Sequence, residues 1–262
     1  MREHIAIIGA GNMGSALFQG LLKHFPEDSL SITDRHPEKL SALRTKRVST
    51  DPKKILANAS VAILAVKPQS FGELCADVKP LFAGKLIVSI MAGITIEKLE
   101  RMTGAKRIVR AMPNLGVQVQ RSVTEWFASL AVTKKDRVLV KNIFDAVGAS
   151  FEVQEEEWMD DIGAVSGCGP AYFFFLCELL QQKAESVGFD PASAQAIAVE
   201  TFAGSAELLA RGSKTPAEWR AAVTSKGGVT EAALTHLREQ GFDRIFLDAL
   251  DRAAKRSREL SA

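Results

Sequence analysis

The sequence predicts a doubly wound α/β sheet followed by an all-α C-terminal domain. Short apolar runs alternate with helical patterns in the first half of the chain, and a glycine-rich turn follows the first run. From about residue 155 onward only helical patterns are found. Such alternation is typical of a parallel sheet with helices on both faces. The predicted domains are therefore residues 1–158 and residues 159–262.

Five apolar runs are the predicted strands of the sheet: residues 4–8, 30–34, 61–66, 85–91 and 107–112. Each run is almost continuously apolar, as expected for a strand that is buried on both faces. Residues 150–153 are one further candidate strand.

Helical patterns occupy the segments between these strands and the second half of the chain. The first group comprises residues 13–25, 38–45, 53–58, 71–82, 96–103 and 134–148. The second group comprises residues 172–187, 192–211, 217–223, 230–240 and 244–260. Pro170, Pro191 and Pro216 support three helix starts, because proline fits the first helical turn.

Composition indicates an ordinary soluble globular protein. The 262 residues are 47% hydrophobic and 24% charged, with a net charge of +2 that is spread along the chain. We therefore expect no nucleic-acid partner and no membrane partner. The 3 cysteines lack metal-ligand spacing, which predicts no metal site and a cytoplasmic, reducing setting. Residues 162–177, the longest uncharged stretch, are interpreted as a buried soluble helix because they are too short to span a membrane.

Gly9, Gly11 and Gly14 form a G-x-G-x-x-G pattern directly after the first predicted strand. In this position the three glycines allow a tight turn, close approach of the backbone to a pyrophosphate, and close helix–sheet packing. The N-terminus of the following helix favours an anion. The pattern predicts a Rossmann-type dinucleotide site, and the alternative is a glycine-rich turn without a ligand.

The end of the second predicted strand bears on the choice of cofactor. Asp34 can accept a hydrogen bond from a ribose 2′-hydroxyl, which favours NADH. Arg35 can pair with a 2′-phosphate, which favours NADPH. These two signals conflict and leave the choice open.

Five segments resemble the pyrroline-5-carboxylate reductase family: GAGNMGSA (9–16), AVKP (65–68), RAMPN (110–114), SGCGPAY (166–172) and TSKGGVT (224–230). Together they cover nearly the whole chain. The resemblance implies a Rossmann domain, an all-α C-terminal domain for dimerisation and substrate binding, and reduction of 1-pyrroline-5-carboxylate to L-proline, the last step of proline biosynthesis. It also implies a homodimer formed through the C-terminal helices, with a decamer as a possible higher assembly.

The resemblance assigns residues to the two sites. For the cofactor, NADPH with NADH as the alternative, the implied contacts are Ile8, Gly9, Ala10, Gly11, Asn12, Met13, Ala65, Val66, Lys67, Pro68, Ile90, Met91 and Ala92. Gly14, Asp34 and Arg35 join them from the glycine pattern and the end of the second predicted strand. The implied contacts to the substrate are Asn114, Ser225, Gly227, Gly228 and Thr230. Backbone N–H groups and hydroxyls suit the substrate carboxylate. Thr230 is the implied catalytic residue, because its hydroxyl can hydrogen-bond the ring nitrogen.

Residues 173–175 are three consecutive phenylalanines near the start of a predicted helix. Aromatic side chains at three successive positions cover all sides of a helix. This arrangement fits burial between subunits better than a cofactor site.

Departures from the family pattern leave alternatives open. Leu115 and Gly116 replace the family's threonine and proline, and Lys226 stands where proline is common. The first alternative is a divergent paralogue that reduces another small imino acid or acts as a dinucleotide-binding sensor. The second is a β-hydroxyacid dehydrogenase, which needs a catalytic lysine one helical turn into the SGCGPAY region. No lysine follows Gly169 until Lys183.

Overall fold

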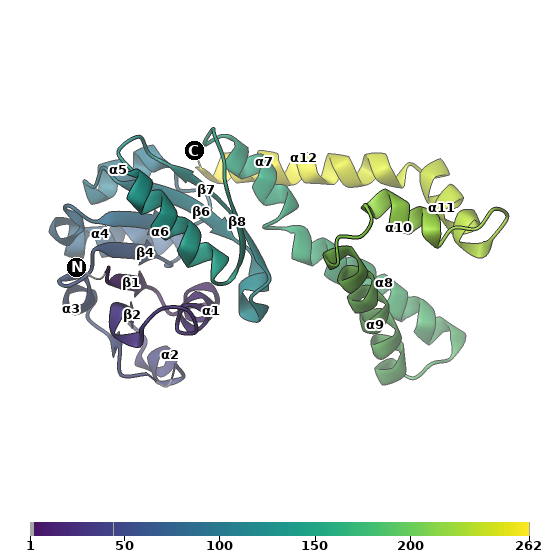
Figure 1. Ribbon diagram of the computed structural model, residues 1–262, viewed down its shortest axis with the longest axis horizontal. Coiled ribbons are helices and arrows are strands. Elements are labelled where there is room, and N and C mark those ends of the chain that lie inside the picture. The colour runs from purple at the N-terminus through teal and green to yellow at the C-terminus, as the bar shows by residue number, and fades with distance from the viewer. Residues whose placement is uncertain (1–2, 44, 262) are drawn as a thin grey trace. The chain divides into compact units, whose positions relative to one another are not determined.

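The computed structural model describes residues 3–43 and 45–261, and the chain forms two compact units (Figure 1). The first unit is Met1–Cys168 with Ala253–Ala262, and the second is Gly169–Arg252. The predicted division at residue 158 differs from this one. Helix α7 (Trp158–Val165) packs against strand β7 (Ser122–Ala128) and so belongs with the sheet.

Within the described residues, the first unit is built on one eight-stranded sheet of order β3-β2-β1-β4-β5-β6-β7-β8. The strands are β1 (Ile5–Ile8), β2 (Leu30–Thr33), β3 (Val48–Ser49), β4 (Val61–Leu64), β5 (Leu86–Ser89), β6 (Ile108–Pro113), β7 and β8 (Gly148–Glu152). Strands β1 to β6 pair in parallel, whereas β7 runs antiparallel to β6. The predicted doubly wound sheet is confirmed, and β3 and β7 are additions to it.

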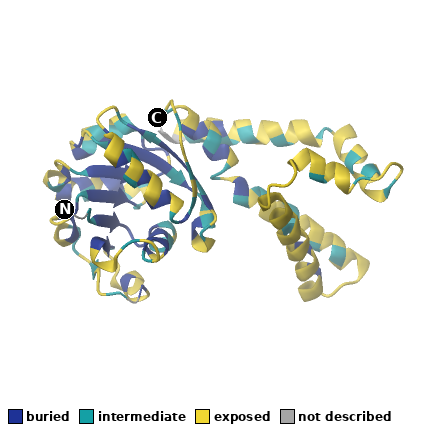
Figure 2. Ribbon diagram, in the orientation of Figure 1, coloured by how far each residue is buried: buried dark blue, intermediate teal, exposed yellow. Residues whose placement is uncertain are grey.

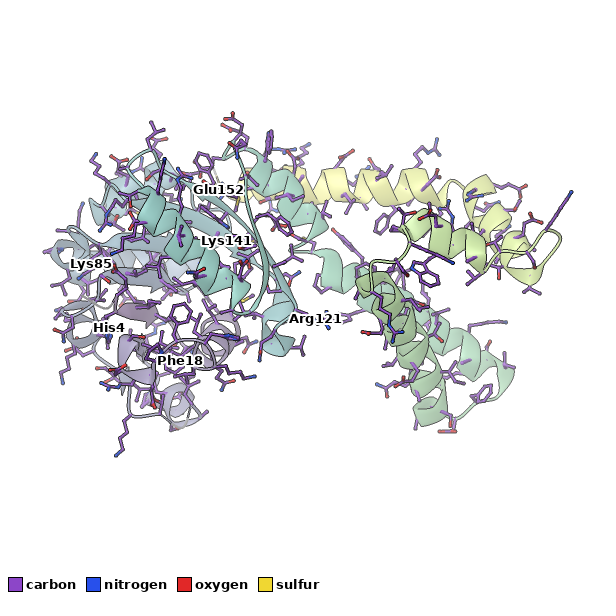
Figure 3. All side chains as sticks on the ribbon, in the orientation of Figure 1. His4, Phe18, Lys85, Arg121, Lys141 and Glu152 are labelled. Atoms are coloured by element: carbon purple, nitrogen blue, oxygen red, sulfur yellow. The ribbon has the colours of Figure 1, made fainter. Side chains whose placement is uncertain are left out.

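Helices cover both faces of this sheet, and each face has its own hydrophobic core (Figure 2). The helices on one face are α1 (Asn12–Leu21), α2 (Pro37–Ser41) and α6 (Lys134–Asp145), and those on the other are α3 (Pro52–Leu56), α4 (Phe71–Val78) and α5 (Ile96–Thr103). Phe18 of α1, labelled in Figure 3, is fully buried in the first core. Burial of such a side chain stabilises the fold by about 1.5–3 kcal/mol.

Short 3-10 helices complete the first unit and connect several of its strands and helices. They are η1 (Glu27–Ser29), η2 (Pro68–Ser70), η3 (Lys79–Phe82) and η4 (Leu115–Val119). Of these, η2 and η4 follow strands β4 and β6 within a few residues, at the strand ends where ligands bind in open α/β sheets.

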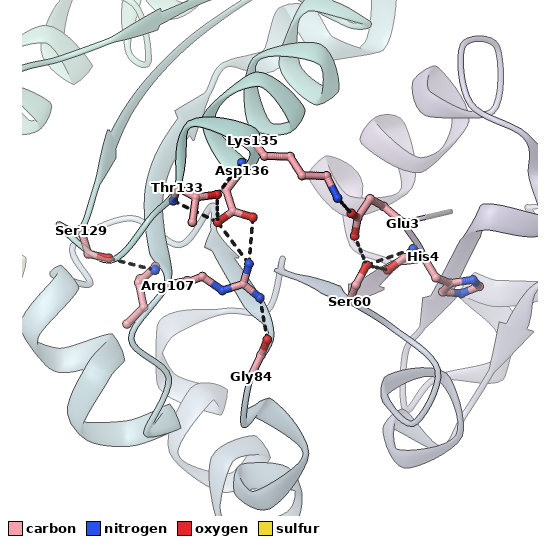
Figure 4. Close-up of polar contacts among 10 residues, drawn as sticks. Glu3, His4, Ser60, Gly84, Arg107, Ser129, Thr133, Lys135 and Asp136 are labelled. Atoms are coloured by element: carbon pink, nitrogen blue, oxygen red, sulfur yellow. Dashed lines mark hydrogen bonds and ion pairs between the residues drawn. The ribbon is translucent and has the colours of Figure 1, made fainter. Parts of the chain in front are cut away.

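A polar cluster connects the start of α6 to the residues just before β5 and β6 (Figure 4). This end of the sheet is opposite to the carboxyl ends of the strands. Thr133 and Asp136 form a capping box, which satisfies N–H groups at the helix start. Arg107 donates to both oxygens of Asp136 at 2.9 and 3.1 Å and to the carbonyl of Gly84 at 2.6 Å. Burial raises the pKa of Asp136, but its hydrogen bonds to Thr133 and Arg107 outweigh burial and lower it. We assign this cluster a structural role.

The second unit is entirely helical in its described residues, which confirms the predicted all-α region. Its elements are α8 (Gly169–Val187), α9 (Pro191–Ala210), α10 (Pro216–Ala222), α11 (Val229–Glu239) and the first part of α12 (Phe242–Ser261). Helices α8 and α9 pack against each other and are joined by a short turn that contains Gly188. Asp190 caps the start of α9 by accepting from two backbone N–H groups.

The prediction that residues 162–177 form one buried helix is wrong for the single chain. Helix α7 ends at Val165 and α8 begins at Gly169, with a turn of three residues between them. The side chains of Phe173, Phe174 and Phe175 are 59–61% exposed. By length and composition alone, one described stretch, Trp158–Val187, could cross a membrane, and 17% of its apolar window is buried.

Candidate functional site

The glycine-rich turn lies between β1 and α1, and two of its glycines are required by close backbone contacts. Gly9 has a φ of +112°, and a Cβ added there would lie 2.5 Å from the carbonyl oxygen of Ala65. A Cβ added at Gly14 would lie 2.0 Å from the oxygen of Gly9. By contrast, a Cβ at Gly11 would meet no described atom within 4 Å. The backbone of Gly11 is thus open to close approach by a ligand.

The N-terminus of α1 begins directly beyond this open glycine. Its N-cap is Gly11, which provides no side-chain cap, and its first turn contains no acidic residue. The first N–H groups of a helix lack internal partners and form the positive end of the helix dipole. This end of α1 can therefore bind a pyrophosphate, which is the role that the glycine spacing predicts.

Asp34, directly after β2, holds the neighbouring turns together. Its carboxylate accepts from the N–H of Ala10 at 2.9 Å and from the N–H of His36 at 3.0 Å, and Lys39 Nζ lies 3.4 Å away. Burial raises the pKa of Asp34, but these hydrogen bonds and the charge of Lys39 outweigh burial and lower it. The carboxylate is thus ionised at neutral pH. It orders the glycine-rich turn whether or not it also contacts a ribose.

A pocket of about 460 Å³ lies at the carboxyl ends of β1, β2 and β4. Its volume suits a nucleotide-sized ligand. The predicted cofactor residues that line it are Ile8, Gly9, Gly11, Asp34, Arg35, Ala65, Val66 and Lys67. The other predicted cofactor residues are not among the described residues of its lining, namely Ala10, Asn12, Met13, Gly14, Pro68, Ile90, Met91 and Ala92. The pocket is therefore built from the predicted turn and from the ends of the neighbouring strands.

Arg35 lines this pocket and forms an exposed ion pair with Glu73, at 3.4 Å between Nη1 and Oε2. The two side chains are 67% and 79% exposed. An exposed pair of this kind contributes little to stability. A cofactor phosphate can therefore replace Glu73 as the partner of Arg35 at little cost to the fold.

On β6, the side chain of Arg110 is buried between two carboxylates. It donates to Asp160 at 3.0 Å and to Glu156 at 3.3 Å, and Ser257 of α12 donates to Asp160 at 2.6 Å. A buried charge needs such partners, because losing one of them leaves the other uncompensated. This network ties β6 to α7 and α12. Sequence reasoning missed it, since the partners lie far apart in the chain.

Asn114, a predicted substrate residue, organises the loop after β6. Its Oδ1 accepts from the N–H of Gly116 at 3.0 Å, and its Nδ2 donates to the carbonyl of Ser166 at 2.9 Å. A Cβ added at Gly116 would lie 2.5 Å from the carbonyl oxygen of Arg121. Glycine at position 116, where the family has proline, therefore fits the close packing of this particular loop.

Glu125 is a buried carboxyl group next to this loop that sequence reasoning missed. It lies on β7, is 3% exposed, and accepts a hydrogen bond from the Ser166 hydroxyl at 2.7 Å. Burial raises the pKa of Glu125, while the bond from Ser166 lowers it by less. Asn114 in the loop after β6 and Glu125 on β7 together hold Ser166.

The segment TSKGGVT forms the turn before α11 in the second unit. Gly227 has a φ of +72°, and its N–H donates to Glu231 Oε2 at 2.6 Å. A Cβ added at Gly228 would lie 2.3 Å from Ser225 Oγ, so the serine hydroxyl lies directly over this glycine. Thr230 follows in the first turn of α11. The structure thus places Ser225, Gly227 and Gly228 in the turn and Thr230, with Glu231, in the first turn of the helix that follows.

The described residues contain no group of three or more His, Cys, Asp and Glu side chains that could hold a metal ion. Cys75, Cys168 and Cys177 are all unpaired. Burial raises the pKa of the Cys75 thiol to about 11, which keeps it protonated at neutral pH.

Comparison with known proteins identifies the family. Residues 156–260 match the family model for pyrroline-5-carboxylate reductase dimerisation, and residues 4–93 match the model for NADP oxidoreductase, coenzyme F420-dependent. Pyrroline-5-carboxylate reductase 2 of Bacillus subtilis is 31% identical over 265 residues, covering 98% of this chain and 95% of the relative.

Solved structures agree with this result. A pyrroline-5-carboxylate reductase from Coxiella burnetii superimposes with a TM-score of 0.92 at 33% identity, covering 99% of each chain. The Plasmodium falciparum pyrroline carboxylate reductase, solved with NADP bound, has a TM-score of 0.87 at 25% identity, covering 100% of this chain and 99% of the other. The chain belongs to the pyrroline-5-carboxylate reductase family.

Proposed function

We propose that this protein reduces 1-pyrroline-5-carboxylate to L-proline with NADPH, and that NADH is the alternative cofactor. The observation that carries the proposal is the presence of two candidate sites in one chain, one for the dinucleotide and one for the imino acid. The first unit has a nucleotide-sized pocket beside the uncapped N-terminus of α1. The second unit has a glycine turn with two hydroxyl side chains, suited to a small carboxylate. Relatives of this family are named for this reaction.

The cofactor is proposed to lie across the carboxyl ends of the parallel strands. The backbone at Gly11 and the start of α1 bind its pyrophosphate, and Asp34 and Arg35 face the adenosine ribose. Support comes from the open approach to Gly11 and from the positions of Asp34 and Arg35 in the pocket wall. The P. falciparum relative was solved with NADP bound, which favours NADPH.

The chemical step asks little of the side chains. When bound, the reduced nicotinamide would supply the hydride that C5 of the protonated ring imine needs to become the secondary amine of proline. The chain must hold the substrate at a distance of about 3–3.5 Å from the hydride donor. We propose that Ser225, Gly227 and Gly228 bind its carboxylate, and that Thr230 hydrogen-bonds the ring nitrogen.

We propose that two chains associate through the C-terminal helices to form a homodimer, and that a decamer is a further assembly. Support comes from the match of residues 156–260 to a dimerisation model. Large exposed apolar side chains on α8 and α9 also support it, because monomers rarely expose contiguous apolar patches: they include Phe173, Phe174, Phe175, Leu179, Leu180, Ile197 and Val199. The unpaired thiols fit a cytoplasmic setting.

A steady-state assay with racemic 1-pyrroline-5-carboxylate tests the proposed reaction, first with NADPH and then with NADH. We expect oxidation of the cofactor that depends on substrate and yields proline. Absence of turnover with both cofactors, in a protein that is folded by circular dichroism, would contradict the proposal.

A further inference from the structure

The side-chain oxygen of Thr33 is buried without a hydrogen-bond partner among the described residues. Thr33 is the last residue of β2 and is 2% exposed. A buried hydroxyl that forms no hydrogen bond is destabilising, because it gives up its bonds to water without replacement. Such a group at a strand end calls for a partner that the chain itself does not supply.

The position of Thr33 indicates where that partner binds. Thr33 pairs with Ile8 of β1, and both residues line the pocket of about 460 Å³ at the strand ends. Ile32 belongs to the core beneath α1, so Thr33 faces the other side of the sheet, as Ile8 does. Thr33 therefore lies in the wall of the candidate cofactor site. Its side-chain oxygen has almost no exposed surface in the cofactor-free chain, so a hydrogen bond to a ligand requires rotation of this side chain.

Ser31 provides a comparison within the same strand. It lies two residues before Thr33, on the same face of the sheet, and is also buried. Its hydroxyl is within hydrogen-bond distance of His4 Nε2, at 3.1 Å. The buried hydroxyl that is remote from the pocket is thus satisfied inside the chain, whereas the one in the pocket wall is not.

We infer that Thr33 is a further cofactor-binding residue whose hydroxyl hydrogen-bonds the adenosine half of the dinucleotide. This inference rests on the proposed function. The adenosine half is favoured because Thr33 directly precedes Asp34, at the strand end where the adenosine ribose is bound in dinucleotide folds. A threonine hydroxyl both donates and accepts, so it suits a ribose hydroxyl or an adenine ring nitrogen.

The variant Thr33→Val tests the inference, because valine keeps the shape and removes the hydroxyl. We expect the Kd for NADPH, measured by calorimetry, to rise about fivefold to tenfold, as for the loss of one net hydrogen bond. We also expect the Tm of the cofactor-free protein to rise, since an unpaired buried group has been removed. Thr33→Ser should retain the affinity for NADPH.

Ser31→Ala is the matched control. It should lower the Tm, because it removes the hydrogen bond with His4, and it should leave the Kd for NADPH unchanged. Two fragments locate the contact: Thr33→Val should weaken binding of 2′,5′-ADP and leave binding of reduced nicotinamide mononucleotide unchanged.

The outcomes separate this inference from the proposed function. If the wild-type protein binds no dinucleotide, both are wrong. If the wild type and Thr33→Val bind NADPH equally well, the Thr33 contact is wrong and the proposed function stands. A lower Tm for cofactor-free Thr33→Val would also overturn the inference, because it would show that the hydroxyl is already satisfied in the free protein.

Discussion

The carboxylate of Glu231 accepts a hydrogen bond from the backbone N–H of Gly227, with 2.6 Å between Oε2 and the nitrogen. Glu231 lies in the first turn of α11, where an acidic side chain is favourable to the helix dipole. The same N–H is one of the groups proposed to bind the substrate carboxylate. An internal carboxylate thus occupies a donor that we propose for the substrate carboxylate.

Replacing Glu231 with glutamine is expected to lower the KM for 1-pyrroline-5-carboxylate by about threefold, with little change in kcat. A neutral amide is a weaker acceptor than a carboxylate, roughly by half, so it competes less for the N–H of Gly227. Steady-state kinetics at saturating NADPH measures the change. Glu239→Gln, at the other end of α11, is the control and should leave the KM unchanged. An unchanged or higher KM in Glu231→Gln would show that Glu231 does not compete with the substrate.

Thr230→Ala is expected to lower kcat/KM for the imine at least tenfold, a loss of about 1.4 kcal/mol in transition-state stabilisation. The physical reason is the loss of the hydroxyl proposed to bind the ring nitrogen. Thr224→Ala is the control within the same segment, because the Thr224 hydroxyl already donates to the carbonyl of Arg220 at 2.6 Å. Thr230→Ser should recover most of the activity. A value near wild type for Thr230→Ala would remove this residue from the site.

Arg35→Ala is expected to raise the KM for NADPH more than the KM for NADH. Only NADPH carries the 2′-phosphate, to which a guanidinium can donate two hydrogen bonds. Glu73→Gln should change the KM for NADPH in the opposite direction. It removes the carboxylate that pairs with Arg35, so the KM for NADPH should fall. Equal effects of Arg35→Ala on both cofactors would mean that Arg35 does not contact the phosphate.

Much of the dinucleotide-binding half could be predicted from the sequence, because its signals are local. The spacing of Gly9, Gly11 and Gly14 fixes a turn after a buried strand, and the structure gives two of them backbone contacts that no side chain would allow. The continuous apolar runs are also a local signal. They predict parallel strands, because helices cover both faces of such a sheet.

Features that depend on distant partners could not be predicted. Strand β7 contains Ser122, Thr124 and Glu125, which are all buried, so its sequence lacks the apolar run that marks the other strands. The unpaired hydroxyl of Thr33 and the contact between Glu231 and Gly227 appear only when side chains are placed in space. The exposure of residues 173–175 in the single chain could not be predicted either, because it depends on which parts of the fold cover this helix.

Phe174→Asp is expected to convert the proposed dimer to a monomer. Phe174 is 61% exposed in the single chain, and burying a charge at an apolar interface is strongly unfavourable. Size-exclusion chromatography with light scattering measures the mass. Leu130→Asp is the control, because Leu130 is a fully exposed apolar residue of the first unit and its variant should stay dimeric. A dimeric Phe174→Asp protein would place the interface elsewhere.

Glu125→Gln is expected to stabilise the protein at pH 8 and to have less effect at pH 5. Burial raises the pKa of Glu125 in the folded chain, while the unfolded carboxyl keeps its ordinary value near 4.5. The folded state therefore binds this proton more tightly, and stability falls as the pH rises from the unfolded value through the raised one. Glutamine carries no charge, keeps the shape, and can still accept the hydrogen bond from Ser166.

Thermal unfolding from pH 5 to pH 8 measures this difference. At pH 8 the Tm of Glu125→Gln should exceed that of the wild type by a few degrees, since about 1 kcal/mol corresponds to about 2–4 °C for a protein of this size. The difference should shrink toward pH 5. Glu157→Gln, which changes an exposed carboxylate at the start of α7, controls for the general loss of a negative charge. A Tm difference that is independent of pH would contradict a raised pKa of Glu125 in the folded chain.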